Sequence, residues 1–99
     1  MVVEHAYITV VPGQEDAFEK AFAEAQPILA TAGGCRSSSL RRDAEHPGSY
    51  LLEVHWERLA DHLEVFPDSK AGKDFAGHVA HFFARVPDVR HFVAEPVPA

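Results

Sequence analysis

The chain has 99 residues, of which 46% are hydrophobic and 24% charged, and this is the composition of one globular domain rather than two. Fifteen acidic residues against nine Lys and Arg give a formal net charge of −6, which argues against nucleic acid or an anionic membrane as a partner. The single cysteine, Cys35, excludes an intrachain disulfide. With no signal-peptide pattern and no apolar stretch of about 18 residues, we expect a cytoplasmic protein.

The hydrophobic periodicity predicts an alternation of strands and helices. Apolar residues that alternate with polar ones are typical of strands, and apolar residues three or four positions apart are typical of helices. In chain order we expect a strand, a helix, two strands, a short helix, a longer helix and a last strand, over residues 2–11, 14–31, 35–42, 50–57, 59–66, 70–86 and 89–95. From about residue 95 the Pro-rich tail should be frayed.

The later elements should each turn one face toward a common core. On the strand 50–57 the expected inward residues are Tyr50, Leu52, Val54 and Trp56. On the short helix they are Leu59, His62, Leu63 and Phe66. On the longer helix they are Ala71, Phe75, His78, Val79, Phe82 and Val86. Each of these two helices therefore presents one histidine to the core.

This order of elements predicts one α+β domain over residues 1–99. The arrangement is the ferredoxin-like split βαβ fold, a four-stranded antiparallel sheet with its helices on one face. The other face of the sheet would still carry apolar residues, namely Val3, Tyr7, Val11 and Leu51. Because an uncovered apolar patch of that size is unusual in a monomer, we expect a homodimer in which two sheets pack face to face.

Five short motifs follow one another along nearly the whole chain. They are Val10-Val11-Pro12-Gly13-Gln14-Glu15 with Phe18 one turn on, Gly33-Gly34-Cys35, Arg42-Asp43 with Pro47-Gly48, Trp56-Glu57, and Val86-Pro87-Asp88-Val89. In order and spacing these motifs resemble the antibiotic biosynthesis monooxygenase family of dimeric α+β barrel proteins. The resemblance implies a homodimer with a small pocket between helices and sheet in each protomer. In the enzymes of the family, it implies cofactor-free oxygenation of an aromatic or quinol-type substrate.

The chain also departs from the family pattern. Val65 stands where the family often has a His or Trp on the short helix, and His62 comes almost one helical turn earlier. Heme-degrading relatives resemble the chain less, because Ala6 and Val65 stand where they have a catalytic Asn and a Trp. His78 lies near the position of their heme-ligating histidine. We therefore do not expect heme cleavage.

Of the seven histidines, His62 and His78 are the candidates for a catalytic base, because helical spacing places them on the inward faces. An imidazole exchanges a proton at about pH 6 to 7, so it could deprotonate a phenol or quinol, and the resulting anion could pass an electron to oxygen. The expected walls of the substrate pocket are Trp56, Phe66, Phe75, Phe82 and Tyr50. The alternative is purely structural, with histidines that rim the core and aromatic side chains that fill it.

We expect neither a metal nor an organic cofactor. His78 and His81 lie three residues apart and could bind a divalent ion with His62 or Asp74, but His81 points away from the inward face. Two functions remain. The first is a cofactor-independent monooxygenase acting with molecular oxygen on a small aromatic, quinol or polyketide-like substrate. The second is a non-catalytic or regulatory protein that binds such a molecule in the same pocket.

Overall fold

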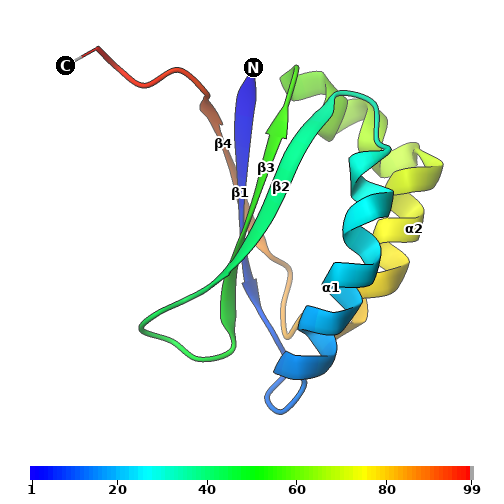
Figure 1. The fold of residues 1–99 in the computed structure, drawn as a ribbon, viewed down its shortest axis with the longest axis vertical. Coiled ribbons are helices and arrows are strands. Elements are labelled where there is room, and N and C mark those ends of the chain that lie inside the picture. Colours follow the sequence, from blue (N-terminus) through cyan, green and yellow to red (C-terminus); the bar gives the residue numbers. More distant parts are fainter. Residues whose placement is uncertain (99) are drawn as a thin grey trace.

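The computed structural model describes residues 1–98 as one α+β domain (Figure 1). The strands are β1 (Val2–Thr9), β2 (Cys35–Arg42), β3 (Ser49–Trp56) and β4 (Asp88–Val93). The helices are α1 (Glu15–Ala30) and α2 (Lys70–Val79). A π-helical turn, η1 (Asp61–Val65), and a 3₁₀ turn, η2 (Phe66–Asp68), precede α2, and a second 3₁₀ turn, η3 (Ala80–Phe82), follows it. Within residues 1–98, none of the helices has both the length and the apolar character needed to cross a membrane.

The four strands form an antiparallel sheet in the order β2-β3-β1-β4, and both helices cover the same face of it (Figure 1). This is the predicted split βαβ fold. The register places Glu4 of β1 opposite Val54 of β3 and opposite His91 of β4. It also places Cys35 of β2 opposite Trp56 at the end of β3. These pairings bring residues from the two ends of the chain to one place under the helices.

The core lies between the sheet and the helices, and it follows the predicted alternation of the strands. On β3 the inward residues are buried as expected: Tyr50, Leu52, Val54 and Trp56. They pack against the buried face of α1, which consists of Phe18, Phe22, Ala25 and Leu29. On β1 the buried side chains are Glu4, Ala6 and Ile8, so that a carboxylate occupies a position whose neighbours are apolar.

The predicted short helix over 59–66 is wrong in its helix type and in two of its four predicted inward residues. The segment forms η1 and η2, and the wider π-turn changes the angle between successive side chains. As a result His62 and Phe66 point inward as predicted, whereas Leu63 is 54% exposed and Leu59 is also exposed. In this turn the side chain of His62 therefore points toward the core and that of Leu63 toward solvent.

The predicted long helix over 70–86 ends earlier than expected. It stops at Val79, and after η3 the chain becomes extended so that Phe83 pairs with Val10 beyond the end of β1. The backbone groups near this point find partners there, since Ala84 N donates to Thr9 O. Val86, predicted to face inward, is 89% exposed for that reason.

A buried aspartate holds η1 against the start of β2. The Asp61 carboxylate accepts hydrogen bonds from the Arg58 backbone N–H at 3.0 Å and from the Arg58 guanidinium at 2.8 Å. It lies directly against Gly34, whose φ is +83, and a Cβ at this position would overlap the Asp61 carboxylate. The π-turn η1 is thus anchored at its first residue, Asp61, and this anchor positions the next residue, His62.

Candidate functional site

Four side chains from four different elements meet at one end of the sheet. The indole N–H of Trp56 donates to Glu4 Oε1 at 2.9 Å. The ring of His62 stacks on Trp56, with ring centroids 5.2 Å apart and planes 14° apart, and its Nε2 lies 3.4 Å from the same Glu4 oxygen. On its other side, His62 Nδ1 lies 2.7 Å from Nε2 of His91. We call these four residues the Glu4 cluster.

The geometry of the cluster follows from strand parity and from the π-turn. Glu4 and Trp56 occupy inward positions of neighbouring strands, and His91 lies directly opposite Glu4 on the edge strand β4. His62 contacts them from the side of the sheet that the helices cover. It lies close to Trp56 because η1 begins five residues after the end of β3. π-helical turns inside proteins are frequent at functional sites, since they redirect a side chain at some cost in helix stability.

Burial controls the charge of the cluster. Burial raises the pKa of the Glu4 carboxyl from 4.5 to about 7, although the hydrogen bond from Trp56 acts in the opposite direction. Burial, and then the neighbouring His91, lower the pKa of His62 from 6.5 to about 4. Burial also lowers the pKa of His91. The expectation of a core imidazole that titrates at about pH 6 to 7 is therefore wrong for His62, and near neutral pH the titrating group is the carboxyl.

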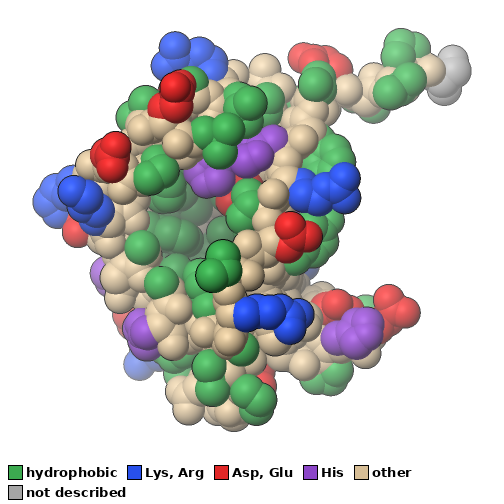
Figure 2. All heavy atoms as spheres, turned by 180° about the vertical axis from the view of Figure 1, so that it is seen from behind, with side chains coloured by type: hydrophobic (Ala, Val, Ile, Leu, Met, Phe, Trp, Pro, Cys, Tyr) green, Lys and Arg blue, Asp and Glu red, His purple; other side chains and the backbone are tan. Residues whose placement is uncertain are grey.

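Aromatic side chains adjoin the cluster. The Phe66 ring lies 5.3 Å from Trp56 and 6.0 Å from His62, and Phe75 of α2 continues the series 6.2 Å beyond Phe66. On the face seen in Figure 2 the surface is hollowed, hydrophobic side chains line the depression, and histidine side chains lie together at its edge. Among residues 1–98, His62 and His91 are the two histidines whose rings contact each other. The rings of Trp56, His62, Phe66 and Phe75 thus form a continuous aromatic series beside Glu4.

The structure separates the other predicted site residues from this cluster. Tyr50 lies six residues from Trp56 along β3, which is about 20 Å in a strand. It packs against Phe18, as does Phe82, so both aromatic side chains belong to the opposite end of the core. His78 lies on α2 and bonds through Nδ1 to the backbone carbonyl of Asp74 at 2.9 Å. The structure thus brings together Trp56, His62 and Phe66.

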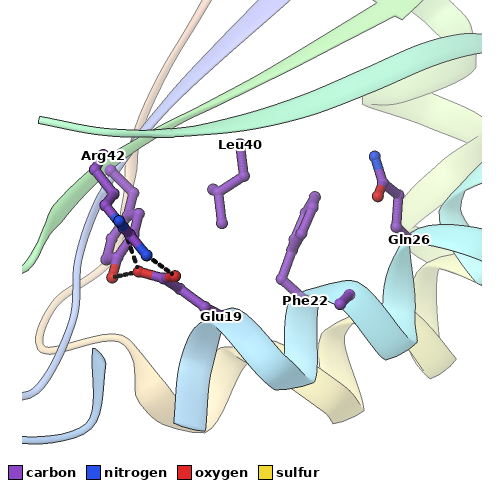
Figure 3. Close-up of a pocket in the computed structure, with 7 residues that line it drawn as sticks. Glu19, Phe22, Gln26, Leu40 and Arg42 are labelled. Atoms are coloured by element: carbon purple, nitrogen blue, oxygen red, sulfur yellow. Dashed lines mark hydrogen bonds and ion pairs between the residues drawn. The ribbon is translucent and has the colours of Figure 1, made fainter. Parts of the chain in front are cut away.

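A second hollow lies between α1 and β2 (Figure 3). It has a volume of about 350 Å³, and Glu19 of α1 reaches across it to Arg42 of β2. Hydrogen bonds from Arg42 and then Tyr50 lower the pKa of Glu19 to about 2, and burial raises the pKa of Tyr50 to about 12. The charges there are fixed across the neutral range, so this hollow offers no group that exchanges a proton.

Two members of the cluster, Glu4 and His91, are not among the residues predicted from sequence. Glu4 does carry a signal, because it interrupts a strand whose alternate positions, Val2, Ala6 and Ile8, are apolar. His91 likewise stands between Val89 and Val93 on one face of its strand. Neither signal says that the two residues are partners, since that depends on the register of β1 against β4.

Comparison with known proteins decides the family. Residues 1–78 match the family model described as antibiotic biosynthesis monooxygenase. YczJ of Bacillus subtilis (strain 168), described as uncharacterized, is 37% identical over 92 residues, or 93% of this chain and 97% of YczJ. A Bordetella bronchiseptica crystal structure described as a "putative antibiotic biosynthesis monooxygenase" has a TM-score of 0.91 at 35% identity, covering 96% of this chain and 97% of the other. The chain belongs to the antibiotic biosynthesis monooxygenase family.

More distant members of the antibiotic biosynthesis monooxygenase family share the fold. A structure from Nitrosomonas europaea has a TM-score of 0.78 at 16% identity and covers 95% of this chain and 98% of its own. In the present family member, His62 and not Val65 reaches the tryptophan at the end of β3, since Val65 is exposed. Across residues 1–98, no three His, Cys, Asp or Glu side chains are arranged so that they could hold a metal ion.

The Glu4 cluster gives the free energy of unfolding two opposite dependences on pH. Between 4.5 and about 7 the folded state holds a proton on Glu4 that the unfolded state has lost, so stability falls as pH rises. Between about 4 and 6.5 the unfolded state holds a proton on His62 that the folded state has lost, so stability rises with pH. Each effect is on the order of 3 kcal/mol, from shifts of between two and three pKa units at about 1.4 kcal/mol per unit.

Single substitutions should separate these two effects. With Glu4→Gln the contributions of His62 and His91 remain, and because burial lowers both pKa values the free energy of unfolding should rise between about pH 4 and 6.5. With His62→Gln the Glu4 contribution is no longer opposed by that of His62, and the free energy of unfolding should fall between 4.5 and about 7. Urea denaturation at a series of pH values measures both curves, and carboxylates elsewhere affect the two variants alike. Parallel curves for the two variants would contradict this account of the cluster.

Proposed function

We propose that the protein is a cofactor-independent monooxygenase that uses molecular oxygen on a small aromatic, quinol or polyketide-like substrate. One observation supports this above the others: a carboxyl that exchanges a proton near neutral pH, Glu4, lies with His62 and His91 beside the aromatic rings of Trp56 and Phe66. Family membership supports a monooxygenase-like role but does not name a substrate. A cytoplasmic location is part of this proposal.

The proposed reaction begins with loss of a proton from a phenol or quinol to the Glu4 cluster, with His62 at its centre. The resulting anion is electron-rich and can reduce oxygen directly. Converting a ring CH₂ into a carbonyl removes four electrons from the substrate, and these reduce O₂ to the new carbonyl oxygen and one water molecule. The substrate thus supplies every electron, and the protein supplies a base beside aromatic side chains.

The alternative is a protein that binds an aromatic molecule without turnover. The hollow between α1 and β2 favours this reading in one respect, because Phe22 and Leu40 line it together with the fixed Glu19–Arg42 pair. A ligand could bind there, but no group could take its proton. The position of a bound substrate therefore separates the two functions.

We also propose that the protein is a homodimer that pairs through the face of the sheet opposite the helices. Tyr7 and Phe92 lie on this face and are 45% and 42% exposed, although both are large and apolar. A second copy would cover them by packing its own sheet against the first.

A charge placed on that face should separate the protomers. We expect light scattering to give twice the 10.9 kDa of one chain for the wild type at micromolar concentration, and one chain for Tyr7→Glu, because two carboxylates would be buried near each other. The matched control Val86→Glu places the same charge on an exposed loop and should remain dimeric. A wild type that scatters as a monomer, or a dimeric Tyr7→Glu, would contradict the proposal.

Oxygen uptake with a dihydroxynaphthalene tests the proposed reaction. We expect His62→Gln to lose roughly 10²- to 10⁴-fold in rate, the usual contribution of a general base. His78→Gln should keep its rate, because His78 bonds to the carbonyl of its own helix and not to the cluster. An oxygen electrode measures both, with circular dichroism as the control for folding. Full uptake by a folded His62→Gln would exclude the Glu4 cluster as the base.

A further inference from the structure

The arrangement of the Glu4 cluster assigns a different task to each of its titratable members. We propose that His91, His62 and Glu4 form a proton relay, in which His91 faces the substrate, His62 passes the proton inward, and Glu4 holds it. This inference rests on the proposed function, since it names the groups that receive the proton in that reaction. Glu4 and His91 thereby become functional residues, and His62 becomes the link between them.

The contacts of the imidazole nitrogens decide which histidine faces the substrate. His62 has no free nitrogen, because Nδ1 lies 2.7 Å from His91 Nε2 and Nε2 lies 3.4 Å from Glu4 Oε1. One face of its ring is also covered by Trp56. Of the four ring nitrogens in the pair, Nδ1 of His91 is the one not bonded within the cluster. His91 lies on the edge strand β4 and is partly exposed, so this nitrogen can meet a ligand.

The protonation of Glu4 sets the tautomers of both histidines. When Glu4 is ionised it accepts from Trp56 and faces Nε2–H of His62 at 3.4 Å, and the bare Nδ1 of His62 then accepts from Nε2–H of His91. His91 Nδ1 is bare in this state and can accept a proton from the substrate. When Glu4 is protonated it donates to Nε2 of His62, and each hydrogen bond of the chain is reversed. His91 Nδ1 then carries a proton and is no longer a base.

In each catalytic cycle one proton passes through the relay from the substrate to Glu4 and later returns along the same path. The substrate O–H bond breaks as an N–H bond forms at Nδ1 of His91. The proton on His91 Nε2 moves to Nδ1 of His62, and the proton on His62 Nε2 moves to the Glu4 carboxylate. No electron moves in this step, and the negative charge passes from Glu4 to the substrate oxygen. The same chain returns the proton when the second oxygen atom of O₂ leaves as water.

The surroundings favour the neutral acid as the place where the proton rests. Burial raises the pKa of Glu4 to about 7 and lowers that of His62 to about 4, so a proton that enters the cluster stays on the carboxyl and not on the imidazole. The other titratable group that faces Glu4 is Cys35 of β2, whose pKa is raised by burial and then by the charge of Glu4. The buried side chains of α1 and α2 are apolar. A neutral relay therefore suits this end of the core.

Nitrogen NMR of the histidine rings, recorded on the whole protein between about pH 5 and 9, tests the relay without any substrate. We expect His62 and His91 to exchange which nitrogen carries the proton, both at about pH 7, as Glu4 titrates. Glu4→Gln keeps an oxygen for Trp56, but its amide N–H₂ donates to His62 at every pH, so the exchange should vanish. The matched control Glu57→Gln removes an exposed carboxylate that pairs with Arg36, and the exchange should persist.

Oxygen uptake on the same three proteins separates the relay from the proposed function. Uptake by the wild type and by Glu57→Gln should rise through about pH 7, and Glu4→Gln should lose roughly 10²- to 10⁴-fold together with this pH dependence. Fixed tautomers in the wild type would overturn the relay whatever the uptake, and this spectrum needs no variant to fold. A tautomer exchange at about pH 7 without uptake from any dihydroxyaromatic would uphold the relay and overturn the monooxygenase.

Discussion

The buried carboxyl of Glu4 is the constraint on which the site depends. A carboxylate inside a core is unfavourable unless hydrogen bonds or a proton compensate for lost hydration. Here the indole of Trp56 provides a hydrogen bond, and His62 and His91 provide a path for the proton. These partners come from β3, η1 and β4, so the sheet register and the π-turn must both be correct for the carboxyl to be tolerated.

The two ends of the core differ in how their charges can respond to a ligand. At the α1–β2 end, Glu19 is ionised and held by Arg42 and Tyr50, and this charge does not change near neutral pH. At the Glu4 end, the carboxyl takes up or releases a proton near neutral pH, and the aromatic rings of Trp56 and Phe66 lie beside it. A group that could take a proton from a ligand near neutral pH is therefore present at the Glu4 end and not at the α1–β2 end.

The sequence predicts the fold well because its strongest signals are local. The alternation on β3 shows its buried face, and even the polar strand β2 is delimited by the glycines before it and the turn after it. Of the residues that meet at the Glu4 end of the core, periodicity predicts Trp56, His62 and Phe66, because they lie on apolar faces of their elements. Glu4 and His91 become partners only through strand pairing across 87 positions of the chain, and the exposure of Leu63 follows from a π-turn that periodicity assumes to be α-helical.

A crystal structure with a bound dihydroxyaromatic analogue that oxygen cannot oxidise tests the central claim, that the Glu4 cluster is the functional site. We expect a ring packed near Trp56 and Phe66, with its hydroxyl about 2.6 to 3.2 Å from Nδ1 of His91. A ligand seated between α1 and β2 against Glu19 and Arg42, with no contact to His91, would contradict it.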